Sequence, residues 1–101
     1  MLNKVALIGH LGSDPEKKYT GSGVPVVSLS LATTEKWKDD GGELQERTEW
    51  HRLVFWRGLA DLVEQYLHKG SKIYVDGKLQ TRQWEDQDGN TRYSTEIVCR
   101  E

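Results

Sequence analysis

Cysteine, proline and long apolar segments are scarce in this sequence of 101 residues. Its one cysteine, Cys99, has no partner within the chain for a disulfide, so the cysteine content gives no sign of an oxidising compartment. No apolar run is long enough to cross a bilayer, and the N-terminus lacks a charged segment followed by an apolar one. We therefore expect a cytoplasmic protein with no membrane partner.

Residue patterns that carry catalysis or metal binding are also missing. The three histidines and Cys99 lack the spacing of metal ligands. The glycines of Gly21–Gly23 do not continue into a dinucleotide fingerprint, and no serine or cysteine lies in a recognisable nucleophile motif. Asp86–Asn90 has some features of a calcium loop, but its glycine comes two positions early and Ile97 stands where the bidentate glutamate belongs. The sequence therefore predicts a protein that is not an enzyme and that holds no metal or cofactor.

Charge is unevenly distributed along the chain, although the formal net charge is only −2. Residues 69–84 carry a local excess of three positive charges, and residues 85–101 carry an equal excess of negative charges. Salt limits the reach of a charge to about 10 Å, so the local distribution matters more than the total. Nucleic-acid-binding domains are often basic overall. This segregation nevertheless permits a basic binding surface on a mildly acidic protein.

Residues Thr48–Trp56 predict the central strand, because they contain neither Gly nor Pro and are rich in β-branched and aromatic types. Side chains alternate along a strand, so Trp50, Arg52 and Trp56 share one face, and His51 falls on the other. Indole rings stack on unpaired bases, and an arginine between them meets phosphate or stacks as a cation. The face therefore predicts binding of a single nucleic-acid strand. The alternative is that both tryptophans belong to the core, since Trp is usually well buried.

Hydrophobic patterning predicts four further strands and one helix. The expected strands are Val5–Leu11, Val24–Thr33, Ser71–Trp84 and Tyr93–Arg100, with a short extended piece at residues 17–19. The helix is predicted over Gly58–Lys69, where five apolar residues from Leu59 to Leu67 form one stripe and Gly70 suits the position after the helix end. Five strands with one helix between the third and the fourth match the OB-fold, a small Greek-key barrel. We expect one such domain over residues 1–101.

Two other stretches place aromatic residues beside cations. Residues Glu35–Glu46 are polar, with glycines at the centre, and predict a long hairpin loop. Trp37 lies in this loop between two lysines, where it has little core to enter, and we interpret it as a binding residue. The loop would act as a gate if it covered the face of Trp50. In the Ser71–Trp84 strand, Lys78, Arg82 and Trp84 fall on one face.

Five parts of the sequence resemble the bacterial single-stranded DNA-binding protein family, in matching order and spacing over essentially the whole chain. These parts are Asn3–Gly12 with Asp14–Glu16, Leu31–Thr33, Thr48–Arg52, Tyr66–Ser71, and Leu79–Trp84 with Asp86 and Gln87. The resemblance implies sequence-tolerant binding of single-stranded DNA, which protects the strand during replication, recombination and repair.

The resemblance also implies which residues contact the DNA. The stacking rings of the family correspond to Trp37, Trp50, Trp84 and, at a position that is usually Phe, Trp56. The cations implied by the resemblance or by the strand faces are Lys4, Lys18, Arg52, Lys69, Lys78 and Arg82. His51 corresponds to a histidine at the family's subunit interface.

Partners follow from the same resemblance. It implies a homotetramer, or a dimer where one chain carries two domains, and one domain per chain favours the tetramer. It also implies a disordered tail with an acidic tip, which recruits replication and repair proteins. This sequence ends at Glu101, at the close of the last predicted strand. Partners of that kind are therefore expected only if the native chain carries the tail.

A second interpretation is an OB-fold module of the primosome type, whose main partner is another protein. The set of four tryptophans argues against it, because a relative that docks on protein has no need of four stacking rings. Replacing Trp50 and Trp84 separates the two interpretations through the affinity for an oligonucleotide.

Overall fold

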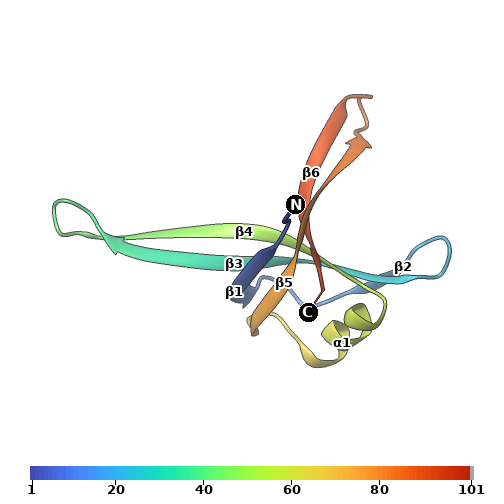
Figure 1. Cartoon of the computed structure of the whole chain (residues 1–101), viewed down its shortest axis with the longest axis horizontal. Coiled ribbons are helices and arrows are strands. Elements are labelled where there is room, and N and C mark those ends of the chain that lie inside the picture. The colour runs from blue at the N-terminus through green and yellow to red at the C-terminus, as the bar shows by residue number, and fades with distance from the viewer. Residues whose placement is uncertain (101) are drawn as a thin grey trace.

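The computed structural model of the chain describes residues 1–100, which form six strands and one helix. The elements are β1 (Val5–Leu11), β2 (Lys17–Tyr19), β3 (Pro25–Lys38), β4 (Leu44–Trp56), α1 (Gly58–Tyr66), β5 (Lys72–Glu85) and β6 (Thr91–Cys99). The strand order is β1-β5-β6-β4-β3-β2, and an added β1–β3 pairing closes five of the strands into a barrel (Figure 1). The predicted OB-fold is confirmed, with α1 after the third barrel strand and β2 as the short extended piece.

The interior of the barrel is filled by the apolar residues that alternate along its strands. Val27, Leu29 and Leu31 of β3 face inward, as do Leu53 and Phe55 of β4, and each of these side chains is at most 4% exposed. Burying a side chain of this size contributes about 1.5–3 kcal/mol. The strand register is therefore fixed strongly, because a shift by one residue would turn all of these side chains outward.

Cys99 closes the interior from the last strand, β6. Its side chain belongs to the core cluster, and burial raises the pKa of the thiol to about 11. The thiol is therefore protonated at neutral pH and packs as a small apolar group. Its role is structural.

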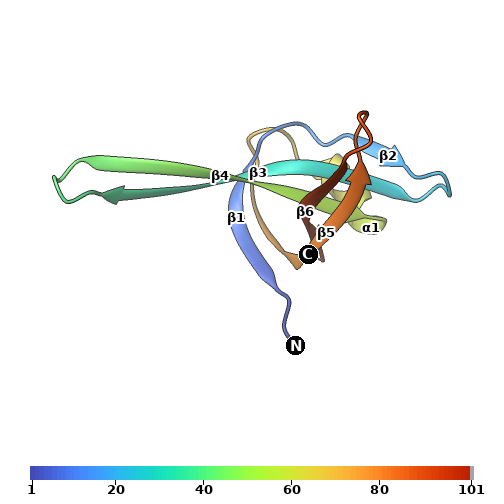
Figure 2. The same ribbon diagram turned by 90° about the horizontal axis from the view of Figure 1, so that it is seen from above.

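A long two-stranded ribbon, which we call the arm, extends from the barrel and is formed by the distal parts of β3 and β4 (Figures 1 and 2). Pairing continues outward to Lys38 opposite Leu44, so only residues 39–43 form the turn. The predicted loop over Glu35–Glu46 is therefore wrong. Polar residues occupy most positions on both faces of the arm, which hides the period of a strand. Backbone pairing holds the arm, and Arg47 forms its ion pair with Glu49 of the same strand, at 2.9 Å.

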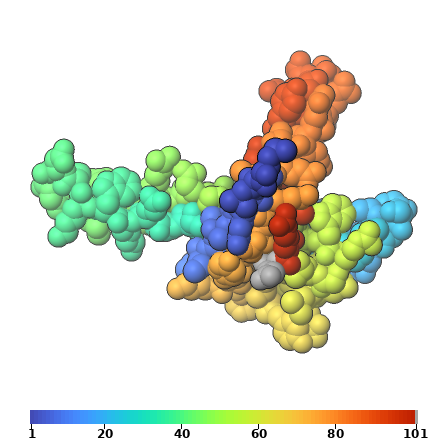
Figure 3. Space-filling view, in the orientation of Figure 1, coloured from blue at the N-terminus to red at the C-terminus, as the bar shows by residue number. Residues whose placement is uncertain are grey.

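The hairpin of β5 and β6 also leaves the barrel, and its ladder reaches Glu85 opposite Thr91. Both hairpins stand away from the body in the space-filling view (Figure 3). The longest dimension is 55 Å and the radius of gyration is 16.1 Å, compared with about 13 Å for a compact domain of this length. Leu79 shares a side of β5 with the buried Val75, but it lies where this hairpin leaves the core and is 50% exposed.

The helix α1 ends three residues before the predicted Lys69. Leu67 is already extended, and its backbone N–H donates to the carbonyl of Val63. The chain then turns toward β1, where the N–H of Gly70 donates to the carbonyl of Leu11. Gly70, with a φ of 88°, therefore serves this turn and does not follow the helix end directly. Tertiary hydrogen bonds thus end the helix before its sequence pattern does.

The buried side of α1 also differs from the predicted stripe. Ala60 and Val63 are buried, and Leu59 and Leu67 pack partly against the core, whereas Leu62 and Tyr66 are exposed. A nine-residue helix presents only a narrow stripe to β3 and β4. No helix within residues 1–100 combines the length and the apolar character needed to span a bilayer.

Candidate nucleic-acid interface

The outward side of the sheet brings together residues from five strands, and we call this surface the binding face. Residues opposite each other in a ladder point to the same side of the sheet. Trp56 lies opposite Val26, which in turn lies opposite Lys18, while Arg52 lies opposite Ser30. The predicted site residues collected on the binding face are Lys18, Trp50, Arg52, Trp56, Lys78, Arg82 and Trp84.

The tryptophans of the binding face are open to solvent. Trp50 is 61% exposed, Trp56 41% and Trp84 43%, so the alternative in which Trp50 and Trp56 are core residues is wrong. Alternation along β4 separates these indoles from the buried Leu53 and Phe55. The predicted gate is also wrong, because the arm leads away from the barrel (Figure 1).

The indole of Trp50 lies against the backbone of Gly12. A Cβ built on Gly12 would lie 2.7 Å from Cζ3 of Trp50, and the Gly12 N–H donates to the carbonyl of Ser30 at 2.9 Å. A side chain at this position would displace the ring. Beside the ring, a hollow of about 210 Å³ is lined by Ser13, Ser28, Leu29, Ser30, Trp50, His51 and Arg52. Nothing in the local sequence around Gly12 indicates this contact, so its part in placing Trp50 was missed.

Two cations of the binding face share one carboxylate. Glu96 of β6 lies between Arg52 of β4 and Arg82 of β5, with N–O distances of 3.6 Å and 3.4 Å. Both guanidinium groups remain about half exposed, which leaves donors free for an anion. Sequence reasoning missed Glu96, although its position on the outward side of β6 was available from the alternation of that strand.

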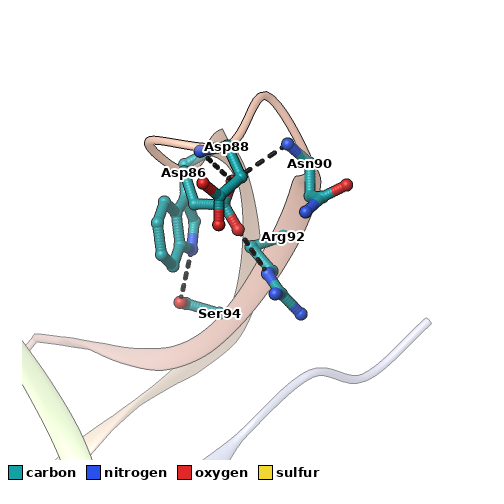
Figure 4. Close-up of polar contacts among 6 residues, drawn as sticks. Asp86, Asp88, Asn90, Arg92 and Ser94 are labelled. Atoms are coloured by element: carbon teal, nitrogen blue, oxygen red, sulfur yellow. Dashed lines mark hydrogen bonds and ion pairs between the residues drawn. The ribbon is translucent and has the colours of Figure 1, made fainter.

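Trp84 is held at the start of the β5–β6 turn by a hydrogen bond from its Nε1 to Oγ of Ser94, at 2.9 Å (Figure 4). The turn itself closes around Asp86, whose carboxylate accepts the backbone N–H groups of Asp88 and Asn90 and the Nε of Arg92 (Figure 4). The Arg92 guanidinium, followed by the backbone donors, holds the pKa of Asp86 below its usual range. A charged Asp86 thus fixes the turn that follows Trp84.

Three predicted DNA contacts lie outside the binding face. Trp37 is 45% exposed on the arm, opposite Gln45, on the side of the ribbon that continues the inward face of the barrel. Lys4 pairs with Asp76 at 3.3 Å, and Lys69 lies in the connection between α1 and β5, where its backbone N–H donates to Asp14. The predicted site is therefore one continuous surface with separate outlying members.

His51 lies on the side of β4 opposite the tryptophans. It is half-buried, and its Nε2 is 2.8 Å from Oγ1 of Thr33. Within residues 1–100, no three His, Cys, Asp or Glu side chains gather in a way that would hold a metal ion. The chemistry available at the binding face is stacking on indoles together with hydrogen bonding and ion pairing by cations.

A model of the Single-strand binding protein family matches residues 2–101 of the sequence. The chain belongs to this family. Proteins of this family are non-enzymatic DNA-binding proteins. It is 60% identical over 99 residues to "Single-stranded DNA-binding protein 1" of Chlorobaculum tepidum, and this match covers 97% of the chain and 61% of the relative.

Further members show the same likeness. "Single-stranded DNA-binding protein 1" of Xylella fastidiosa is 54% identical over 101 residues, covering 99% of the chain and 74% of the relative. A solved structure, "Plasmodium falciparum SSB complex with ssDNA", superimposes with a TM-score of 0.86 at 41% identity and covers 97% of the chain and 86% of that protein. The chain thus spans somewhat less than two thirds of the Chlorobaculum protein and more of the other two.

Gly12→Ala tests whether the bare backbone at Gly12 seats the Trp50 ring. The φ of Gly12 is not in the positive region, so alanine causes no backbone strain, but its Cβ collides with a ring that is free to rotate away. We expect the indole N–H signal of Trp50 to shift in a two-dimensional NMR spectrum, with little change in melting temperature. Gly21→Ala is the control, because nothing lies within 4 Å of its Cβ. An unmoved Trp50 signal in Gly12→Ala would contradict this arrangement.

Proposed function

We propose that the chain binds single-stranded DNA with little sequence preference, by stacking bases on tryptophans and pairing phosphates with lysines and arginines. The observation that carries the proposal is the shared outward side of Trp50, Trp56 and Trp84, interleaved with Arg52 and Arg82. The family and the ssDNA complex of the Plasmodium protein support the same ligand.

Stacking explains the tolerance to base sequence, because every base has a π-face. Each stacked base contributes about 1–3 kcal/mol to the binding free energy, as measured by alanine substitution. Duplex DNA hides those faces inside the helix, so it gains only contacts to its phosphates. The exposure of the three indoles of the binding face leaves their rings accessible to bases. Phosphate contacts make the affinity fall as salt rises.

The outlying residues extend the path of the strand in this proposal. Trp37 adds a stacking ring on the arm, beyond the barrel. Lys69, beside the turn that holds Gly12, and Lys4, at the start of β1, add positive charge at the margins of the binding face. RNA is also accommodated, because nothing on the face is placed to read a 2′-hydroxyl.

The biological role proposed here is protection of single strands during replication, recombination and repair, in the cytoplasm at the nucleoid. This role follows from the family rather than from the geometry of the chain. Recruitment of replication and repair proteins belongs to the proposal only where the native chain carries an acidic tail.

We also propose that the chain forms a homotetramer with His51 at a subunit interface. The support is an apolar patch beside a strand that has little pairing on one side. Ile8 of β1 is 60% exposed and lies opposite Tyr74 of β5, which is 53% exposed. β1 pairs with β3 through only two residues, His10 and Leu11, so most of that edge is open. An open edge beside exposed apolar side chains favours association.

Replacing Trp50 or Trp84 with alanine tests the stacking proposal. Each variant is expected to weaken binding of oligo(dT) by about 1–3 kcal/mol, which is about fivefold to 150-fold, because it removes one stacking ring. Equilibrium titration by fluorescence anisotropy measures the change. Circular dichroism is expected to show an intact fold, since both rings project from the barrel.

Tyr66→Ala is the matched control, since Tyr66 is an exposed aromatic residue on α1, away from the binding face. Its affinity for oligo(dT) should equal that of the wild type. Unchanged affinity in both tryptophan variants would refute stacking and favour the alternative of a protein-docking module.

Sedimentation equilibrium tests the proposed assembly. The expected mass is four times that of the 11.6 kDa chain. Ile8→Lys places a charge in the apolar patch and is expected to give smaller species, as is His51→Ala, whereas Leu62→Lys on α1 leaves the tetramer intact. A wild-type mass of one chain at micromolar concentration would contradict the proposal.

A further inference from the structure

Glu96 places an acidic group in the middle of a surface that otherwise presents cations and aromatic rings. Its side chain is 12% exposed, while those of Arg52 and Arg82 are 51% and 54% exposed. The carboxylate therefore forms part of the floor of the binding face, with one guanidinium group on each side. Its two oxygens are shared between them, Oε2 toward Arg52 and Oε1 toward Arg82.

The stacking rings flank this carboxylate along two strands. Trp50 is two residues from Arg52 on β4, and Trp84 is bonded to Ser94, two residues from Glu96 on β6. Residues two apart on a strand share a face, at a spacing of roughly 7 Å. A strand that stacks on both rings therefore passes over Glu96.

We propose that Glu96 sets the selectivity of the binding face for single-stranded over double-stranded DNA. This inference rests on the proposed function. The carboxylate cancels part of the positive charge of Arg52 and Arg82, so that a polyanion gains little at the centre of the face from charge alone. A ligand that also stacks on Trp50 and Trp84 keeps its affinity.

The carboxylate of Glu96 lowers the binding affinity for duplex DNA more than the affinity for single-stranded DNA. A duplex carries one phosphate per roughly 1.7 Å of its axis and offers no open base face, so the phosphates are what it presents to Glu96. A single strand lays neutral bases on the rings and can turn its phosphates toward the exposed guanidinium groups and the lysines, away from Glu96. Repulsion by the negative charge therefore weakens duplex binding more than single-strand binding.

Neutralising Glu96 tests the proposal, through E96Q, which keeps the shape of the side chain, and E96A, which adds no amide donor beside the arginines. Dissociation constants are measured for oligo(dT) and for a duplex of equal length over a series of salt concentrations. Duplex affinity is expected to rise about fivefold in both variants, and its salt dependence to steepen by about 0.9 in log–log slope. Affinity for oligo(dT) is expected to change less, so the ratio between the two ligands falls.

The control is Glu64→Gln, which removes the same charge from α1, where Glu64 pairs with Lys17 at 3.5 Å. Its ratio between the two ligands should equal that of the wild type. Circular dichroism melting verifies that each variant is folded, and a fold retained in either E96Q or E96A suffices for the test.

The outcomes separate the two levels of the proposal. A wild-type protein that does not bind oligo(dT) refutes the proposed function itself. A wild type that binds, with an unchanged ratio in the folded Glu96 variants, overturns only the role of Glu96. Weaker binding of both ligands by both variants also overturns it, because Glu96 would then serve to hold the two arginines in place.

Discussion

Register between β3, β4 and β6 is the constraint on which both the core and the binding face depend. Leu53 and Phe55 are buried only because β4 is held in one register against its neighbours, opposite Leu29 and Val27 of β3. The same register turns Trp50 and Arg52 outward, since side chains alternate along the strand. The register that is stabilised by burial of the core therefore also determines which side chains form the stacking surface. A slip by one residue would destroy both.

The charge of the binding face is balanced rather than simply positive. A protein with a net charge of −2 concentrates cations on one surface and places a carboxylate among them. Stacking depends on the area of the exposed rings and is insensitive to salt, whereas phosphate contacts weaken as counterions are added. The combination favours a ligand that offers open bases and phosphates together, which is an unpaired strand.

The barrel strands and the outward side of β4 were predictable from sequence, because burial imposes a period of two on Leu53, Phe55 and their neighbours. The arm was not, because it has no core beneath it: polar residues such as Glu35 and Arg47 lie opposite each other in its ladder and leave no hydrophobic period. The end of α1 was missed because hydrogen bonds to β1 stop it. The contacts of Gly12 with Trp50, and of Glu96 with Arg52 and Arg82, join residues of different strands, which no local pattern reveals.

Titration of intrinsic tryptophan fluorescence with oligo(dT), at low and at high salt, tests the central claim most directly. Exposed indoles that stack on bases are expected to be quenched to a saturating limit, and the binding is expected to weaken as salt displaces the phosphate contacts. Absence of quenching at every salt concentration would contradict the account. The tryptophans of the binding face would then serve contact with protein rather than with DNA.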